Sequence, residues 1–364
     1  MQYMIYGHGG NIHELAGRLG CNLEDIIDMS SNINPYGPPP GLLDHLKDRL
    51  SSIAALPQTD GADIVNAFSR QYEIDPSRVL AGNGTTQLIY TIPRALESQN
   101  VLICGPTYSD YADACIMNKV KFDYFMADES DKFIPDFEKF KKEIPGHDTV
   151  FICNPNNPTG TLTDRDTIIN ICQSFPNTVF VIDESYLPFV SNDGAKTVAG
   201  ADVEIENLIV LNSMSKIFRI PGLRIGFAIV SKSLVPRMKQ YSLPWSVNSL
   251  AQAAVLYLMK NKAMVLQFIT SSNKSIDENK AAFLKKMASL KGIRFFDSAT
   301  VFILAKIEND ELMAEGVCTQ LADEKILIRN CTNFSGLGGR FIRISLKLPE
   351  INDMLSDRLS NIFK

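Results

Sequence analysis

The stretch Leu208-Ile209-Val210-Leu211-Asn212-Ser213-Met214-Ser215-Lys216 joins a short apolar run to a polar end that carries one lysine. The apolar part predicts a buried strand, because short runs rich in β-branched residues are typical of strands covered on both faces. Partial burial at the strand end would lower the pKa of Lys216 and leave its amine free to attack an aldehyde. Taken alone, the segment also fits a surface lysine that follows a strand.

Similar runs recur along the chain and alternate with helical segments. Each is short, and each is followed by Gly, Pro, Asn or Ser: Val79–Ala81, Val101–Cys104, Thr149–Cys153, Val179–Ile182 and Ile225–Val230. This alternation predicts an α/β fold with a mostly parallel central sheet and crossover helices. Ligands bind at the carboxyl ends of the strands in such sheets, which is where the polar motifs fall.

The pattern outside this region predicts three parts. Residues 1–40 are rich in turn formers and end in Asn34-Pro35-Tyr36-Gly37-Pro38-Pro39-Pro40, so we expect an irregular arm that covers part of the active site. Residues 41–245 form the large domain and begin with a helix over Leu42–Ile53. Residues 246–364 contain a long linking helical region, Ser246–Lys291, and a small α+β domain with strands at Phe302–Lys306 and Phe341–Ser345.

Composition excludes several classes of function. The 364 residues carry a net charge of −5, which argues against nucleic acid as the main partner. We find no signal peptide and no apolar stretch of about 20 residues, so we expect a cytoplasmic protein without a membrane span. The seven cysteines are scattered without a CxxC pair, which predicts neither disulfides nor a metal site.

A second polar motif ends another predicted strand, in Val181-Ile182-Asp183-Glu184-Ser185-Tyr186. A buried carboxylate needs a cationic partner, and the protonated pyridine nitrogen of a cofactor would be such a partner for Asp183. Tyr186 would donate to the phenolic oxygen of the same cofactor. An aspartate that caps a helix is the alternative.

Two further segments, together with Tyr108, complete a phosphate and ring site. The loop Ala81-Gly82-Asn83-Gly84-Thr85-Thr86 lies between a strand and a helix, where backbone amides and hydroxyl groups bind anions. In Asn154–Gly160 the prolines forbid a helix, and Asn157 would donate to the ring oxygen. Tyr108 would stack on the ring, whereas Ser213 and Arg224 would hold the phosphate near Lys216.

Together, in this order, the four segments resemble the fold-type I pyridoxal 5'-phosphate (PLP) enzymes, the superfamily of aspartate and histidinol-phosphate aminotransferases. The resemblance covers nearly the whole chain. It implies a PLP-dependent enzyme with two domains, covalent attachment of PLP by Lys216, and a homodimer with active sites at the subunit interface.

A narrower resemblance rests on segments outside the cofactor motifs: Gly7-His8-Gly9-Gly10-Asn11-Ile12, Ser31-Asn32-Ile33-Asn34-Pro35, Pro244-Trp245-Ser246-Val247-Asn248 and Leu327-Ile328-Arg329-Asn330-Cys331. These are similar to the threonine-phosphate decarboxylases of cobalamin biosynthesis. One position departs from the wider family, because relatives commonly have a Tyr-Pro pair where this chain has Leu56-Pro57. That tyrosine reaches the PLP phosphate of the neighbouring subunit.

The resemblance also implies a substrate site. Arg343 would bind the α-carboxylate of the substrate, and Arg329 would bind its phosphate together with His8, Gly9 and Asn32. Arginine suits both anions because its guanidinium group donates in a planar fork. Asn157 would also contact the substrate. Residue chemistry alone leaves open a turn role for His8 and a surface ion pair for Arg329.

The resulting hypothesis is decarboxylation of O-phospho-L-threonine, or of O-phospho-L-serine, to the phosphorylated amino alcohol of the cobalamin nucleotide loop. The two substrates differ by one methyl group, and the sequence does not separate them. Histidinol-phosphate aminotransferase is the alternative enzyme. A non-catalytic PLP-fold domain is a third reading, although the chain shows no helix-turn-helix extension.

Overall fold

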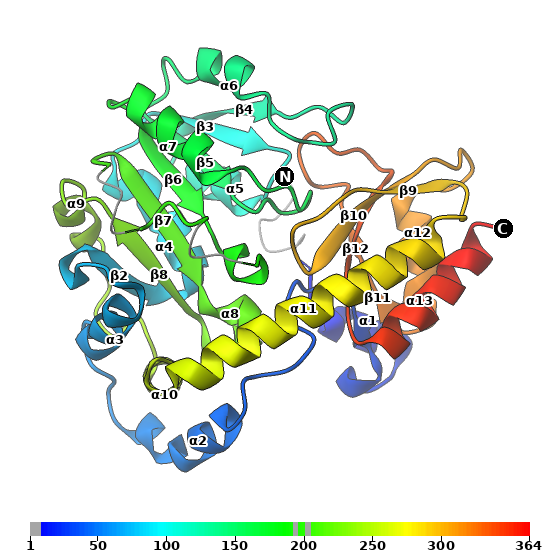
Figure 1. The fold of residues 1–364 in the computed structure, drawn as a ribbon, viewed down its shortest axis with the longest axis horizontal. Coiled ribbons are helices and arrows are strands. Elements are labelled where there is room, and N and C mark those ends of the chain that lie inside the picture. The colour runs from blue at the N-terminus through cyan, green and yellow to red at the C-terminus, as the bar shows by residue number, and fades with distance from the viewer. Residues whose placement is uncertain (1–8, 192–195, 201–204) are drawn as a thin grey trace.

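The computed structural model describes residues 9–191, 196–200 and 205–364 of the chain. The described residues contain a seven-stranded sheet, a four-stranded sheet and a short two-stranded pair. In Figure 1 the larger sheet and its helices lie on one side of the molecule, and the smaller sheet lies on the other. The long helix α11 (Lys262–Met287) runs between the two sides.

The large sheet has the strand order β2-β8-β7-β6-β5-β3-β4. Its neighbours pair in parallel except β8, which is antiparallel to both β2 and β7. The strands are β2 (Val79–Asn83), β3 (Asn100–Gly105), β4 (Lys121–Met126), β5 (Thr149–Cys153), β6 (Val179–Asp183), β7 (Leu208–Ser213) and β8 (Ile225–Val230). The predicted α/β fold with a mostly parallel central sheet is confirmed.

Helices cover both faces of this sheet, which is why its central strands are apolar along their whole length. One face packs against α4 (Gly84–Ala95), α5 (Asp110–Met117) and α9 (Val235–Lys239). The other face packs against α3 (Ala62–Tyr72), α6 (Phe137–Glu143), α7 (Arg165–Ser174) and α10 (Ser249–Lys260). The polar strand ends are thereby left as the positions where side chains can meet a ligand.

The helical region predicted over Ser246–Lys291 is two helices, α10 and α11. They separate at Asn261, whose backbone (φ −101°, ψ 46°) leaves the helical range. In Figure 1 the second helix crosses from the large sheet to the small one, and α13 (Pro349–Ile362) lies beside it.

The small sheet is antiparallel and has the order β12-β13-β10-β9. Its strands are β12 (Arg329–Asn330), β13 (Phe341–Ser345), β10 (Phe302–Ile307) and β9 (Ile293–Phe295). Helices α12 (Ala314–Asp323), α11 and α13 bury its apolar face in a separate core. The expected α+β layer is therefore present.

The segment after residue 8 packs against the core of the small sheet and forms a separate two-stranded pair. It contains α1 (Ile12–Leu19) and β1 (Ile27–Asp28), which pairs in parallel with β11 (Ile326–Leu327). Met29 is fully buried in the small-domain core. The predicted helix over Leu42–Ile53 is shorter: α2 (Leu42–Asp48) is followed by a 3₁₀ segment, Leu50–Ala54. The proposed domain boundaries at residues 40 and 245 stay a prediction.

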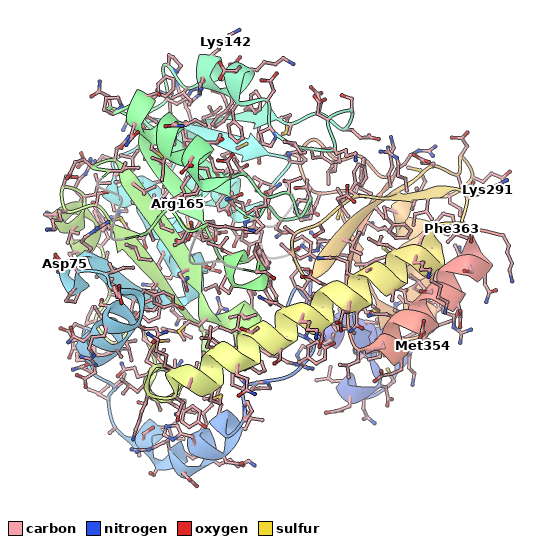
Figure 2. All side chains as sticks on the ribbon, in the orientation of Figure 1. Asp75, Lys142, Arg165, Lys291, Met354 and Phe363 are labelled. Atoms are coloured by element: carbon pink, nitrogen blue, oxygen red, sulfur yellow. The ribbon has the colours of Figure 1, made fainter. Side chains whose placement is uncertain are left out.

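Side chains of opposite character separate as expected for a folded domain. Figure 2 shows Lys142 and Lys291 at the periphery of the molecule, and both are exposed. All seven cysteines are free thiols. Among the helices of the described ranges, none has the length and apolar character needed to cross a membrane.

Candidate active site

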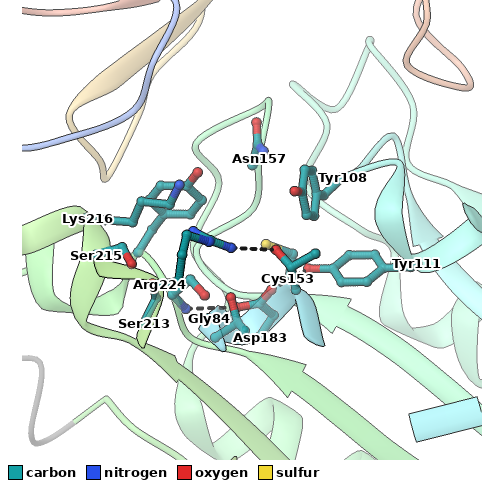
Figure 3. A pocket seen from close by; sticks show the side chains of 14 residues that line it. Gly84, Tyr108, Tyr111, Cys153, Asn157, Asp183, Ser213, Ser215, Lys216 and Arg224 are labelled. Carbon is teal, nitrogen blue, oxygen red and sulfur yellow. Dashed lines mark hydrogen bonds between the residues drawn. The ribbon is translucent and has the colours of Figure 1, made fainter. Parts of the chain in front are cut away.

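A cavity of about 70 Å³ lies at the carboxyl ends of the central strands. In Figure 3 Lys216 and Tyr108 lie on opposite sides of it, and Asp183 lies at its base. It is lined by Gly84, Thr85, Thr86, Tyr108, Tyr111, Cys153, Asn157, Asp183, Ser185, Tyr186, Ser213, Ser215, Lys216 and Arg224. All ten residues predicted to contact the cofactor are in this set, which we call the cofactor pocket.

Lys216 reaches the cofactor pocket from α8 (Met214–Ile217), the short helix that begins where β7 ends. Although part of the side chain is accessible, burial of the amine lowers the pKa of Lys216 to about 8. The positive charges of Arg224 and Arg343 lower it further. A substantial fraction of the amine is therefore neutral, and nucleophilic, near physiological pH.

Asp183 is the last residue of β6 and is buried. Its Oδ2 accepts a hydrogen bond from the Tyr111 hydroxyl at 2.8 Å, and its Oδ1 accepts from the Ser185 N–H at 2.9 Å. These donors are neutral, so the carboxylate still lacks a positive charge in direct contact among the described residues. A protonated ring nitrogen would supply that charge.

Backbone and arginine together form a cradle for an anion at the N-terminus of α4. Gly84 begins the helix with a φ of +71°, and a Cβ at this position would lie 2.6 Å from Arg224 Nη2. Arg224 donates to Thr86 Oγ1 at 3.4 Å. A glycine with left-handed backbone, a guanidinium group and a helix N-terminus therefore meet at one point, as phosphate binding requires.

The remaining predicted ring contacts also reach the cofactor pocket. Burial raises the pKa of Tyr186 to about 12, so its phenol stays protonated and can donate. Asn157 is buried in the loop after β5. Tyr108 and Ser213 line the pocket as predicted, and their roles toward a cofactor stay predictions.

A larger cavity of about 400 Å³ adjoins the cofactor pocket and shares Tyr108, Asn157, Tyr186 and Lys216 with it. Its other lining residues come mainly from the two ends of the chain: Gly9, Gly10, Asp28, Ser30, Ser31, Asn32, Ile33, Ser109, Pro221, Arg329, Phe334 and Arg343. We call it the substrate cavity. The predicted substrate contacts Gly9, Asn32, Asn157, Arg329 and Arg343 all line it, whereas His8 lies outside the described residues.

Two arginines face each other across paired strands of the small sheet. Arg329 on β12 is the direct partner of Arg343 on β13 in the antiparallel register, so both side chains leave the same face. Burial lowers the pKa of Arg329 to about 10 and also lowers the pKa of Arg343. Like charges placed directly opposite destabilise a sheet, so this pair predicts an anionic ligand in the cavity.

Buried polar atoms of the cavity that lack hydrogen-bond partners also indicate a bound ligand. Arg343 donates to Asn157 Oδ1 and to the Ser30 carbonyl at 2.7 Å, but its Nε has no partner among the described residues. Asn32 donates to the Tyr186 hydroxyl at 3.3 Å, whereas its buried Oδ1 has no partner within the described ranges. Buried groups of this kind are normally satisfied, so a bound ligand is the expected partner.

Sequence reasoning missed several lining residues. Tyr111 lies three residues after Tyr108, in the first turn of α5, and this closeness in sequence is the signal that could have indicated its contact with Asp183. Asp28 and Ser30 line the substrate cavity without any motif that marks them. Trp245, from a segment that carries the narrower resemblance, lies outside both cavities: it donates its backbone N–H to the Thr59 carbonyl and is exposed. Leu56, where the chain departs from the family, is 76% exposed.

Comparison with protein families decides what this geometry represents. The model for aminotransferase class I and II matches residues 24–359, which include nearly all of both cavities. The chain belongs to this family. Like other members of the aminotransferase class I and II family, it is a PLP-dependent enzyme.

Relatives within the family carry more than one activity in their names. The chain is 33% identical over 98% of its length to the adenosylcobalamin biosynthesis bifunctional protein CobDQ of Leptospira interrogans, but spans only 41% of that protein. It is 29% identical to the threonine-phosphate decarboxylase of Salmonella typhimurium, covering 98% of this chain and 96% of that one. A histidinol-phosphate aminotransferase of Thermoanaerobacter is 28% identical, with 92% of each chain covered.

A solved structure supports the same placement. The L-threonine-O-3-phosphate decarboxylase of Porphyromonas gingivalis superposes with a TM-score of 0.83 at 28% identity, covering 93% of this chain and 99% of the other.

The pocket of this aminotransferase-family chain fits each functional group of PLP. The neutral amine of Lys216 suits its aldehyde, and the Asp183 carboxylate suits its ring nitrogen. The glycine and arginine of the α4 cradle suit its phosphate.

Proposed function

We propose that this enzyme decarboxylates a phosphorylated α-amino acid, O-phospho-L-threonine or O-phospho-L-serine, and releases the phosphorylated amino alcohol. The product would serve as the linker of the cobalamin nucleotide loop. Relatives named for threonine-phosphate decarboxylation and for adenosylcobalamin biosynthesis support this assignment.

The observation that carries the proposal is the pair of arginines on β12 and β13. A phosphoamino acid has two anionic groups at its ends, a carboxylate and a phosphate of about −1.5 to −2 charge. Arg343 lies next to Asn157 and the cofactor pocket, which suits the carboxylate at the reacting carbon. Arg329 is the direct strand neighbour of Arg343 and suits the phosphate.

The protein's own residues would divide the remaining work. When bound, PLP supplies an electron sink for the negative charge that develops at Cα. Asp183 would hold the protonated ring nitrogen of the cofactor, and Arg343 would hold the carboxylate of the substrate. Lys216 lines both cavities, so its amine would hold the aldehyde of the cofactor and could also donate a proton to Cα of the substrate.

A transaminase uses the same residues but loses the Cα proton instead of CO₂. Histidinol-phosphate aminotransferase is therefore the second candidate, since relatives with that name match the chain almost as well. Histidinol phosphate itself has one anionic group rather than two. The two facing arginines fit a single substrate with both a carboxylate and a phosphate. The 2-oxoglutarate of a transaminase also has two anionic ends, so an assay without keto acid is needed to separate the two functions.

The test is an assay of the purified enzyme with phosphothreonine and phosphoserine in parallel, with no keto acid added. We expect release of CO₂ and formation of the phosphorylated amine in equal amounts. A requirement for 2-oxoglutarate, with a ketone or aldehyde product, would contradict decarboxylation and support the aminotransferase.

We further propose that the enzyme is a cytoplasmic homodimer. Large apolar side chains are exposed over the segment around α2, namely Leu43, Leu50, Ile53 and Leu56, and the loop before α10 adds Leu243 and Trp245. Exposed apolar residues gathered in this way are typical of a protein interface. Analytical ultracentrifugation checks the dimer, and the variant Leu56→Asp is expected to weaken it.

A further inference from the structure

The loop Asp28–Asn34 forms one wall of the substrate cavity and is anchored in the small domain. Before the loop, β1 pairs with β11. Within it, the Met29 carbonyl accepts a hydrogen bond from the Ser345 N–H at 2.8 Å. The start of the loop is therefore hydrogen-bonded to the end of β13, the strand that carries Arg343.

The Asp28 side chain fixes the conformation of the first residues of the loop through hydrogen bonds. Its Oδ1 accepts three hydrogen bonds, from the Ser30 N–H at 2.8 Å, the Ser30 hydroxyl at 2.7 Å and the Ser31 N–H at 3.1 Å. Burial raises the pKa of Asp28, but these hydrogen bonds and the charge of Lys347 bring it below its usual value. The carboxylate is thus ionised and holds Ser30 in one conformation.

Ser30 then makes contacts in two further directions. Its hydroxyl accepts a hydrogen bond from the Gly10 N–H at 2.7 Å, which joins the segment Gly9–Gly10 to the loop. Its carbonyl accepts from Arg343 Nη2 at 2.7 Å. Ser30 is buried, so neither contact competes with bulk water.

Gly9 also packs against the contact between Ser30 and Arg343. A Cβ on Gly9 would lie 2.5 Å from the Ser30 carbonyl oxygen and 3.4 Å from Arg343 Nη2. The backbone at Gly9 therefore packs against the hydrogen bond between Arg343 and the Ser30 carbonyl, which orients the guanidinium group. Ser30 therefore contacts three groups: the Gly10 N–H, the Asp28 carboxylate and Arg343, the arginine predicted to bind the substrate carboxylate.

We propose that Ser30 is a positioning residue that aims Arg343 at the carboxylate of the amino acid substrate and holds Gly9 and Gly10 beside it. Ser30 acts through Arg343 and not on the reacting atoms. This inference rests on the proposed function, in which the substrate is an amino acid whose carboxylate binds Arg343.

The experiment compares ligands that differ only in the carboxylate. Dissociation constants are measured by stopped flow, from the initial absorbance change of the bound cofactor in the holoenzyme before turnover, for O-phospho-L-threonine and for 1-amino-2-propanol O-phosphate, which lacks the carboxylate. L-Alanine and ethylamine form a second pair without phosphate. The variants are Ser30→Ala, Gly9→Ala and, as a matched loss of a buried serine hydroxyl, Ser345→Ala, whose Oγ has no partner among the described residues.

For Ser30→Ala we expect amino acid binding to weaken about tenfold, since loss of the hydroxyl that joins Asp28 to the Gly10 N–H leaves the Ser30 carbonyl less firmly held toward Arg343. Binding of the amines should change less than about twofold. Gly9→Ala should give the same selective pattern, because its Cβ would displace the Ser30 carbonyl. Ser345→Ala should change neither ligand class. In Ser30→Ala, amide hydrogen exchange at Gly10 should also become faster.

Equal weakening of amino acids and amines, or no change in either, would overturn the proposal even if exchange at Gly10 is faster. Failure of the proposed function looks different. In that case the wild-type enzyme binds amino acids but releases no CO₂ from phosphothreonine, and the comparison between each amino acid and its amine still decides the role of Ser30.

Discussion

The cofactor pocket and the substrate cavity adjoin each other but are built in different ways. The cofactor pocket has a volume of about 70 Å³ and takes its lining from residues 84 to 224, mostly at the ends of strands in one sheet. The substrate cavity is about 400 Å³ and adds residues 9–33 and 329–343, from loops and from the small sheet. The first is assembled within one domain, and the second forms only where the two ends of the chain meet.

This difference separates two chemical tasks. Groups in the cofactor pocket fit PLP whatever its substrate, and they are compatible with both activities named among the relatives. We expect selection of substrate and of the bond to be broken to depend on the substrate cavity, where two arginines face each other. Damage to one site should therefore leave the other measurable.

The largest expected effect follows from removal of the amine in the cofactor pocket. Lys216→Ala should lower the rate by at least about 10³-fold, because nucleophile and proton carrier are lost together. The absorbance band of the lysine-bound cofactor, which borohydride bleaches in the wild type, should be absent while the circular dichroism spectrum is retained. Lys286→Ala, at a surface ion pair on α11, is the control and should behave as wild type.

Loss of one arginine should affect the substrate cavity alone. Arg329→Gln is expected to raise KM for phosphothreonine about 10²-fold, since removal of a charged partner from a buried anion costs about 2–5 kcal/mol. The cofactor spectrum should not change. Arg358→Gln removes an exposed ion pair with Glu324 and serves as the control. If KM stays at the wild-type value, Arg329 does not bind the substrate phosphate.

A pH series sharpens the account of the cofactor pocket. With a lowered pKa of about 8, the Lys216 amine loses its proton earlier than an ordinary lysine. The rate of PLP attachment to the apoenzyme should rise roughly 50-fold between pH 6 and pH 8, as the neutral fraction grows, and level off above about pH 9. Stopped-flow absorbance measures this rate. A continued tenfold rise per pH unit to about pH 10 would mean that the amine is not perturbed.

The smallest effect concerns the phosphate cradle. Gly84→Ala places a Cβ 2.6 Å from Arg224 Nη2 at a position with φ +71°, so both contact and backbone resist the change. We expect PLP affinity to fall about tenfold, in line with roughly 1–2 kcal/mol for a left-handed residue. Gly17→Ala is the matched control, since its Cβ would meet open space. Equilibrium dialysis of PLP would detect the difference.

Much of the large sheet could be predicted because burial on both faces leaves a continuous apolar run. Strands β5, β8 and β13 have the predicted ends, Thr149–Cys153, Ile225–Val230 and Phe341–Ser345. The edge strand β4 (Lys121–Met126) was missed, because its charged and half-exposed residues show no such run. Strands β11 and β12 contain two residues each and are too short to show any period.

The sites follow the same division. Lys216 and Asp183 could be placed together because they lie at the carboxyl ends of β7 and β6, and Arg224 precedes the antiparallel strand β8, whose amino end lies at the same edge of the sheet. Asp28 and Ser30 could not, because their contacts with Arg343 and Gly10 depend on loop conformation and on pairing between residues about 300 positions apart.

The origin of the substrate cavity from both chain ends has a consequence for biosynthesis. During translation, all lining residues of the cofactor pocket have been synthesised once Arg224 is added to the chain. Arg343 is synthesised 119 residues later. At about 5–20 residues per second, that interval is roughly 6 to 24 s. During it, the nascent loop at Asp28–Asn34 has no β11 or β13 to pair with. A nascent chain can thus contain the complete set of cofactor-binding side chains well before it can recognise a substrate.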